Sequence, residues 1–225
     1  MKIKNIAVMT ACIIFASISQ TLSLKADIGV CACWDSVSMN IYERFGIKVG
    51  TVSIIINCSL VAVQLLIQRK EFRIVKILQV PLAVLSGVIV NIMYYNVFTF
   101  EVGSYAFRVI LLLLSYTGLA VFVGAMTTLD IISMPLESLC YAVEKKYGIP
   151  FSRLRMAADV ICITASLAMS LVFGLSLKIR EGTVMGFLLL GPLMGFCMKI
   201  EKKLFSGNIL RSSAAVDREK AAEKV

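Results

Sequence analysis

Six apolar segments, each close to the length of a membrane-spanning helix, constrain this chain more than any other feature. A helix needs about 20 residues to cross the ~30 Å hydrocarbon core of a bilayer. The composition agrees, since 59% of the 225 residues are hydrophobic and only 16% are charged, whereas about a quarter of the residues in soluble domains are charged. We therefore expect an all-α, multi-pass membrane protein with six transmembrane helices, at residues 6–24, 50–67, 77–98, 105–127, 156–177 and 183–198.

Basic residues are unevenly distributed between the connections. If the N-terminus lies inside, the inner segments hold 17 Lys and Arg residues and the outer connections hold 6. Lys and Arg accumulate in the cytoplasmic loops of membrane proteins. The bias predicts that both termini are cytoplasmic. It also explains the net charge of +9 without a nucleic-acid partner.

Residue usage argues against an enzyme. The chain has seven Cys and no His, so it contains no Ser-His-Asp triad and no histidine proton relay. Cys31 and Cys33 form a C-x-C pair, but two thiols alone do not make a zinc site, and packing explains them. The sequence has no phosphate-binding loop and no dinucleotide fingerprint. We expect no catalytic residue, no cofactor and no metal.

Two connections have a helical periodicity of their own. After Ser36, apolar residues recur every four positions as far as Phe45. After Pro135, an apolar face continues to Tyr147, opposite charged residues. This spacing is typical of amphipathic helices, which commonly lie in the membrane interface. We expect one interfacial amphipathic helix in each connection.

The two halves of the chain share an order of features. Gly46 stands 11 residues before Asn57, and Gly148 stands 11 residues before Asp159. Because each half has three spans, the second copy would enter the membrane from the opposite side, as in inverted-repeat transporters. The alternative is a duplication that builds a bundle without transport. The expected units are a first three-helix repeat, a second three-helix repeat and a cytoplasmic polar tail, at residues 1–104, 105–198 and 199–225.

Several short motifs follow one another along nearly the whole chain. They are Gly29 with Trp34-Asp35, Gly46 with Gly50-Thr51, Gln79-Val80-Pro81 with Gly87 and Asn91, Met134-Pro135-Leu136-Glu137, Phe151, Asp159, and Glu181-Gly182-Thr183. This series resembles the YczE/YitT-type family of uncharacterised bacterial membrane proteins. Three positions depart from the family pattern: Cys33 replaces a Pro, Asn91 replaces an Asp, and Glu181 interrupts a Gly-rich turn. The resemblance implies the same fold and a location in the bacterial plasma membrane, and it implies no particular substrate.

Polar side chains in or beside the spans are candidates for a substrate or ion site, because such groups are costly in a membrane. The candidates are Trp34, Asp35, Asn57, Asn91, Asp130 and Asp159. Structural explanations remain open for each of them. Asp159 can pair with Arg155 one turn earlier, and the two Asn side chains can bridge helices. The Trp-Asp pair can anchor and cap a helix, and Asp130 can cap another.

Small residues recur along the last span. Gly182 and Gly186 are four positions apart, as are Gly191 and Gly195. This spacing is typical of close helix packing in membranes. Since Pro192 interrupts the span, a broken helix that lines a path is the alternative.

The preferred functional hypothesis is a small secondary transporter or permease for a small solute, with no ATP site of its own. The alternative is a membrane accessory or scaffold protein that assists or regulates a partner. The expected partners are the lipid bilayer and a small solute, with a second copy of the chain or another membrane protein as further candidates.

Overall fold

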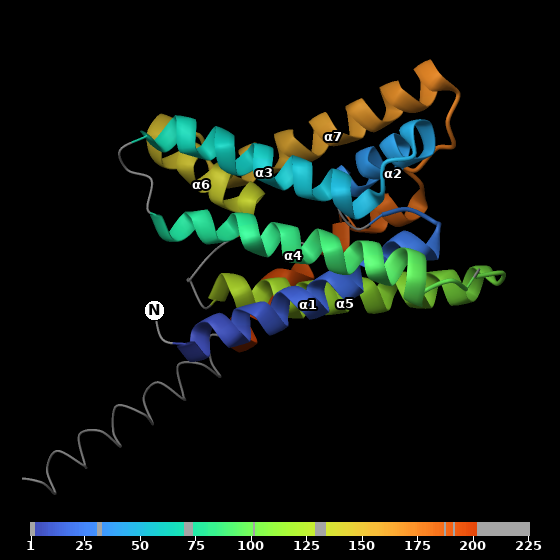
Figure 1. The fold of residues 1–225 in the computed structure, drawn as a ribbon, viewed down its shortest axis with the longest axis horizontal. Helices are drawn as coiled ribbons and strands as arrows, with labels where there is room; N and C mark the ends of the chain where they lie inside the picture. Colours follow the sequence, from blue (N-terminus) through green and yellow to red (C-terminus); the bar gives the residue numbers. More distant parts are fainter. Residues whose placement is uncertain are drawn as a thin grey trace, which may run out of the picture.

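The computed structural model describes residues 3–30, 33–69, 74–100, 102–128, 134–186, 188–190 and 192–201, and the regular elements in these ranges are all helical (Figure 1). The helices are α1 (Ile3–Ala26), α2 (Cys33–Phe45), α3 (Val49–Gln68), α4 (Gln79–Ile92), α5 (Tyr105–Thr128), α6 (Pro135–Tyr147) and α7 (Phe151–Phe173). A 3₁₀ turn precedes α4 and a π-helical turn follows it, at Ile74–Leu78 and Met93–Val97. The last helical residues, here called the C-terminal span, are 181–186, 188–190 and 192–201.

Six segments of the described chain are long and apolar enough to cross a membrane, as predicted. They are Val8–Ala26, Val49–Gln68, Lys76–Val97, Tyr105–Met126, Arg153–Phe173 and Glu181–Glu201. The fifth differs most from its prediction at 156–177, because α7 begins directly after Pro150 and ends at Gly174, whose φ is 62°. A proline before the first turn and a left-handed glycine after the last define these ends better than the apolar run does.

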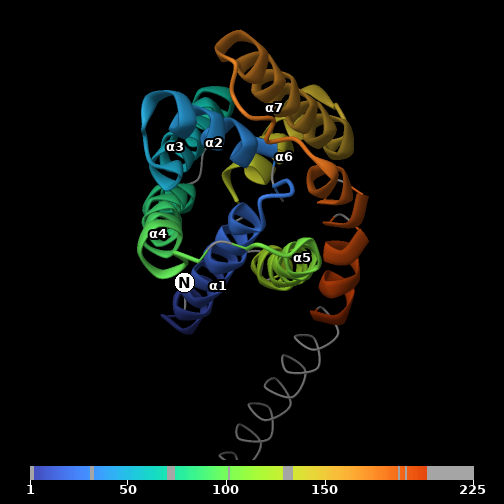
Figure 2. The same ribbon diagram turned by 90° about the vertical axis from the view of Figure 1, so that its right-hand side faces the viewer.

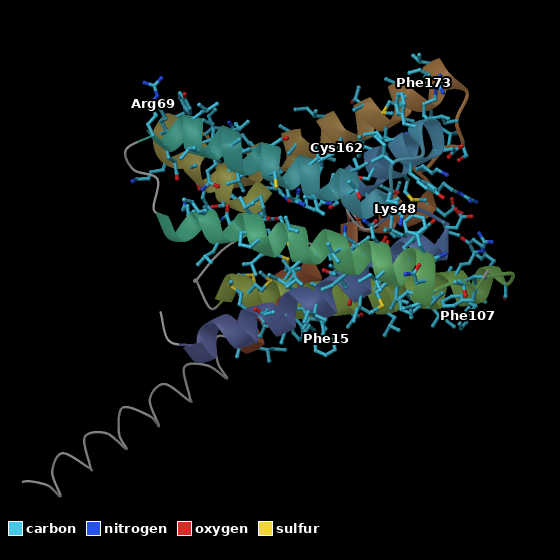
Figure 3. All side chains as sticks on the ribbon, in the orientation of Figure 1. Phe15, Lys48, Arg69, Phe107, Cys162 and Phe173 are labelled. Carbon is cyan, nitrogen blue, oxygen red and sulfur yellow. The ribbon has the colours of Figure 1, made fainter. Side chains whose placement is uncertain are left out.

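The outer surface of the bundle is strongly apolar. Leu171, Val172 and Leu66 are 80%, 75% and 71% exposed. Phe15 of α1 and Phe107 of α5 are also half exposed, on the outside of the bundle (Figure 3). Large contiguous apolar surfaces are rare on soluble monomers. Here they supply the face that contacts lipid.

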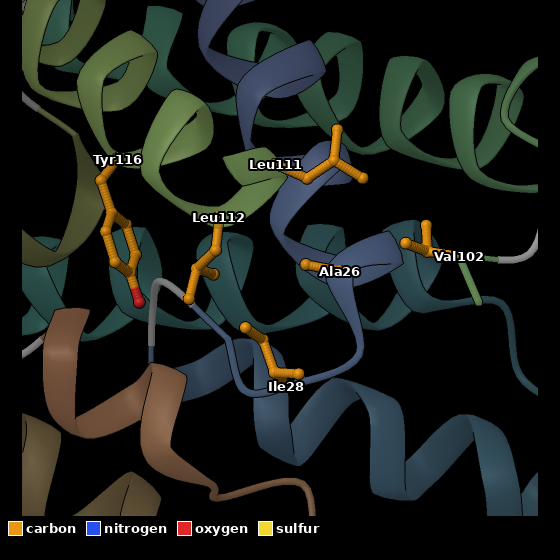
Figure 4. Close-up of a cluster of buried hydrophobic side chains, with 6 residues drawn as sticks. All are labelled: Ala26, Ile28, Val102, Leu111, Leu112 and Tyr116. Atoms are coloured by element: carbon orange, nitrogen blue, oxygen red, sulfur yellow. The ribbon is translucent and has the colours of Figure 1, made fainter. Parts of the chain in front are cut away.

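Two of the long helices pack directly against α1. It lies against α5 and α4, and α4 lies against α3. Figure 2 shows α3 and α4 on one side of the molecule and the C-terminal span on the other. Gly118 of α5 allows the side chain of Ser19 in α1 to approach closely. A buried apolar cluster joins the end of α1 to α5 (Figure 4); its members are Ala26, Ile28, Val102, Leu111, Leu112 and Tyr116.

The short helices α2 and α6 form where the periodicity predicted helices, but their interfacial placement is not confirmed. Each has 13 residues and is therefore about 20 Å long, which is less than the thickness of a bilayer core. Both pack against α3 and α7. The polar side of α2 is enclosed by the bundle, since Asp35, Ser36, Ser38 and Asn40 are fully buried.

Each short helix is held by a buried amide hydrogen bond to a long one. Asn40 Nδ2 of α2 donates to the carbonyl oxygen of Ser166 in α7 at 2.8 Å. Gln64 Nε2 of α3 donates to Ser138 Oγ of α6 at 2.9 Å. Because buried amides require partners, these two bonds fix α2 to α7 and α6 to α3.

The C-terminal ends of α2 and α6 lie at opposite ends of the bundle (Figure 1). The end of α2 is next to the segment that follows α7, where Lys178 Nζ is 2.8 Å from Glu43 Oε2. The end of α6 is next to the end of α3, where Lys146 Nζ donates to the carbonyl oxygen of Ile67 at 3.1 Å. The two short helices therefore start inside the bundle and run outward in opposite directions.

The segment before α2 is bonded to the start of the C-terminal span. The Gly182 N–H donates to the Ile28 carbonyl at 2.8 Å, and the Val30 N–H donates to Thr183 Oγ1 at 3.2 Å. Gly29 has a φ of 132°, and a Cβ there would overlap the backbone of residues 182 and 183. Only glycine fits this backbone conformation and this close approach.

Candidate functional site

A cavity of about 530 Å³ lies inside the bundle, with residues from α1 to α7 and the C-terminal span around it. Both short helices reach it with their N-terminal ends. Cys33 and Trp34 line it from α2, and Pro135 and Glu137 line it from α6. The volume is in the range of small-molecule sites, roughly 300–1,000 Å³.

Arg155 of α7 joins three elements at the wall of the cavity. Its Nη1 atom is 3.0 Å from Asp159 Oδ1 on the same helix, and its Nε atom is 3.8 Å from Glu137 Oε1 of α6. The guanidinium also lies over the ring of Trp34 in α2, 5.5 Å from the ring centroid. The contact to Asp159 is a hydrogen-bonded ion pair, whereas the contact to Glu137 is longer than a hydrogen bond.

Two buried polar atoms beside this ion pair have no hydrogen-bond partner within the described chain. They are Trp34 Nε1 and Glu137 Oε2. An unsatisfied buried donor or acceptor costs about 1–3 kcal/mol, more for a charged group, and native proteins keep few of them. Both side chains line the cavity, so a guest molecule there can supply the missing partners after a change of rotamer.

Asp35 lies behind the cavity wall. It is fully buried, and its Oδ1 atom accepts a hydrogen bond from Gln20 Nε2 at 2.7 Å. Oδ2 has no partner among the described residues. Burial raises the pKa of Asp35 to about 7, although the hydrogen bond from Gln20 opposes the rise. Since Gln20 lines the cavity, it links this carboxyl group to the cavity.

The rest of the cavity wall combines small polar side chains with flexible apolar ones. Ser17 and Ser86 share a hydrogen bond of 2.8 Å, and Asn57 donates to the Ser53 carbonyl of its own helix at 2.9 Å. Methionine supplies much of the apolar wall, where its unbranched side chain adapts to irregular shapes. The methionines at the cavity are Met126, Met134, Met156, Met194 and Met198.

The site has few features of a metal or thiol centre. In the chain from residue 3 to 201, leaving out the gaps given above, no group of three or more His, Cys, Asp or Glu side chains is arranged to hold a metal ion. Burial, followed by the charge of Asp159, raises the pKa of Cys33 to about 12. Its thiolate, the reactive form, is therefore scarce at neutral pH.

The structure brings some of the predicted polar candidates together. Trp34, Asn57 and Asp159 line the cavity, and Asp35 adjoins it through a single side chain. Asn91 does not line it. Its Oδ1 atom accepts from the Gly50 N–H at 2.9 Å, so it ties α4 to the start of α3. Asp130 and Gly191 lie outside the described residues.

The described glycines of the last span have different surroundings. A Cβ at Gly182 would lie 2.7 Å from the Ile28 carbonyl oxygen, and one at Gly186 would lie 2.8 Å from the hydroxyl of Tyr116. These two positions allow close packing against the segment before α2 and against α5. Nothing lies within 4 Å of the corresponding point at Gly195, which lines the cavity with Gly186.

Sequence reasoning missed Glu137 and Gln20 as site residues and considered Arg155 only as a partner of Asp159. One signal for Glu137 was present. It stands 11 residues before Gly148, as Asp35 stands 11 residues before Gly46. No sequence signal distinguishes Gln20, because its role depends on how the chain folds back after α1 and brings Asp35 of α2 against it.

Comparison of the sequence with known protein families gives a match over most of the chain. The family of unknown function DUF6198 matches residues 3–199, which include α1 to α7 and all but the last two described residues of the C-terminal span. The chain belongs to this family. It is 25% identical over 199 residues to the uncharacterised membrane protein YczE of Bacillus subtilis, covering 88% of this chain and 86% of YczE. The predicted resemblance to YczE-type proteins is thereby confirmed. No solved structure matches the chain.

Proposed function

We propose that this protein is a small secondary transporter of the bacterial plasma membrane, and that the central cavity is its solute-binding site. One observation carries the proposal: a cavity of about 530 Å³ lies where two short helices of opposite direction begin, each buried near its N-terminal end. Many secondary transporters bind their solute near the middle of the membrane, beside the ends of half-length helices. An accessory or scaffold protein could instead be a helix bundle whose interior is filled by side chains.

The proposal includes two inverted structural repeats. Asp35 and Glu137 are each the third residue of a short helix. The helices end at Gly46 and Gly148, whose φ angles are 71° and 70°. These matching positions support a common origin of residues 1–104 and 105–198.

The hydrogen bonds of the short helices support the same relationship. α2 of the first half bonds to α7 of the second, through Asn40 and Ser166. α6 of the second half bonds to α3 of the first, through Gln64 and Ser138. The short helix of each half is thus bonded to a long helix of the other half. A rocking motion between the halves would open the cavity first to one side of the membrane and then to the other.

The orientation follows from the charge bias. With both termini in the cytoplasm, the end of α6 faces the cytoplasm and the end of α2 faces outward. Lys and Arg then number 17 inside and 6 outside, which agrees with the distribution found in bacterial inner-membrane proteins.

Cysteine labelling from the two sides of the membrane tests the transport mechanism. In a variant without its seven native cysteines, Ser86→Cys places one thiol at the cavity. A membrane-impermeant maleimide is applied to right-side-out and inside-out vesicles. A transporter that alternates between two states should be labelled from both sides.

Ser166→Cys is the matched control, because Ser166 is 1% exposed and does not line the cavity. It should resist the reagent from both sides until the protein is denatured. Labelling of Ser86→Cys from one side only, or from neither, would contradict alternating access and favour the accessory role.

A further inference from the structure

The geometry points to an amphipathic organic cation as the ligand of the cavity, with its cationic group over Trp34, between Glu137 and Asp159, and its apolar body against the methionine-lined wall. This inference deepens the proposed function by naming the class of solute. It concerns binding, so it is tested separately from movement across the membrane.

The charges at the cavity favour a cation. Of the described residues that line it, only Arg155, Glu137 and Asp159 are charged. The carboxylates therefore outnumber the guanidinium by one. An anion would bring a further negative charge beside two buried carboxylates, while a monovalent cation would neutralise the excess.

The N-terminal ends of α2 and α6 act in the opposite direction. A helix N-terminus carries about half a positive charge, which attracts anions. Each of these ends already has a carboxyl group of its own at the third position, Asp35 in α2 and Glu137 in α6. Glu137 is already included in the excess of one carboxylate. The half charges of the two ends are therefore offset by the carboxylate of Asp35, and the excess of one negative charge remains while Asp35 is ionised.

Arg155 shows how a cation is held at this wall. Its guanidinium lies 5.5 Å from the centroid of the Trp34 ring, a distance at which cations are attracted to an aromatic face. Its contact to Glu137 is 3.8 Å long, and Glu137 Oε2 has no partner in the described chain. A ligand ammonium can replace the guanidinium over Trp34, and it can contact Glu137 Oε2 once that buried side chain changes its rotamer, while Arg155 keeps its 3.0 Å bond to Asp159.

The apolar wall suits the other end of such a ligand. Five methionines line the cavity, from α5, the segment before α6, α7 and the C-terminal span. Methionine-rich surfaces accept apolar groups of varied shape. The cavity therefore favours a cation with a hydrophobic body over a small hydrated ion, which would leave this wall uncovered.

The test uses two probes of nearly the same shape and opposite charge, tetraphenylphosphonium and tetraphenylborate. Trp34 is the single tryptophan of the chain, so emission excited at 295 nm reports on the cavity alone. Isothermal calorimetry of the detergent-purified protein measures each affinity independently. Tetraphenylphosphonium should bind at least about tenfold more tightly than tetraphenylborate and should change the Trp34 emission. Equal affinities, or tighter binding of the anion, would overturn the inference.

Matched variants locate the site. Glu137→Gln should weaken tetraphenylphosphonium binding at least about tenfold. Glu43→Gln, the same substitution outside the cavity, should leave it unchanged. If Glu137→Gln binds the cation as tightly as the wild type, Glu137 has no part in the site and the inference fails. Should that variant not fold, Trp34→Phe, followed by calorimetry, should bind the cation severalfold more weakly, and an unchanged affinity would refute the inference.

The two proposals can fail separately. Cation binding with labelling of Ser86→Cys from one side only would keep the cation site and reject transport. Labelling from both sides without preference for the cation would keep transport and reject this class of solute.

Discussion

Asp35 allows a prediction whose magnitude follows from the structure. The carboxyl group is fully buried, and its pKa rises from the ordinary 3.8 to about 7. The folded protein therefore keeps a proton that the unfolded chain releases between pH 4 and pH 7. Wherever the folded state binds more protons, the free energy of unfolding falls as the pH rises. The difference between the two pKa values corresponds to about 4 kcal/mol of unfolding free energy, because one pKa unit is worth about 1.4 kcal/mol.

Asp35→Asn removes this dependence and keeps the shape of the side chain. Between pH 5 and pH 8 the free energy of unfolding of the wild type should fall by about 3 kcal/mol, whereas that of the variant should not show this fall. For a chain of this length, the thermal unfolding midpoint of the variant in detergent should rise relative to that of the wild type by roughly 6–12 °C between pH 5 and pH 8. The exposed Asp27→Asn variant is the control and should follow the wild type. If the curves of wild type and Asp35→Asn stay parallel from pH 5 to pH 8, the folded protein does not hold this proton.

The same titration affects the proposed cation site. Asp35 accepts a hydrogen bond from Gln20 of α1, which is neutral, and interacts electrostatically with the Cys162 thiol of α7. Ionisation of Asp35 thus adds a negative charge behind the cavity wall. Tetraphenylphosphonium should bind the wild type more tightly at pH 8 than at pH 6, and Asp35→Asn should remove that increase. Equal gains in the two proteins would assign the effect to another group.

Two further predictions concern helix packing. Gly50→Ala places a methyl group against the carbonyl oxygen of Gly87 where α3 crosses α4, so it should cost about 1–3 kcal/mol and lower the unfolding midpoint by several degrees; Gly103→Ala, which meets nothing within 4 Å, should leave the midpoint unchanged. Tyr116→Phe removes the buried hydrogen bond from the hydroxyl to the Gly182 carbonyl and should cost about 1–2 kcal/mol; an unchanged midpoint in urea or heat would show that this bond does not hold the C-terminal span to α5.

The number of spans could be predicted from the sequence because the bilayer imposes a length on apolar helices. Local pairs were also predictable. Asp159 and Arg155 are four residues apart on one helix, and the structure joins them at 3.0 Å. The contacts of Arg155 with Trp34 and Glu137 depend instead on where α2 and α6 enter the bundle. Helical periodicity carries no information about that entry.

Asn91 shows the limit of reasoning from polarity alone. Its depth within the third span made it a candidate for a solute site. In the structure, its amide oxygen accepts a hydrogen bond from the Gly50 N–H at the start of α3. Gln20, which was not considered, lines the cavity and binds Asp35. Both are amides in apolar helices, so composition and spacing describe them equally well. The side of the helix that each occupies distinguishes them, and that depends on the packing of α1 against α4 and α5.

The interfacial placement of α2 stays a prediction, because an amphipathic pattern does not specify what its polar face contacts. Water, lipid headgroups and a buried network all favour the same periodicity. The type of polar residue is more informative. Interfacial helices carry Lys and Arg on the polar side, whereas α2 presents Ser36, Ser38 and Asn40, all fully buried. Inside the bundle, Ser36 and Ser38 donate to carbonyl oxygens of their own helix, and Asn40 donates to Ser166 of α7. A 13-residue helix of this kind, shorter than the bilayer and buried on its polar side, fits the half-length helix of the proposed transporter better than a helix on the membrane surface.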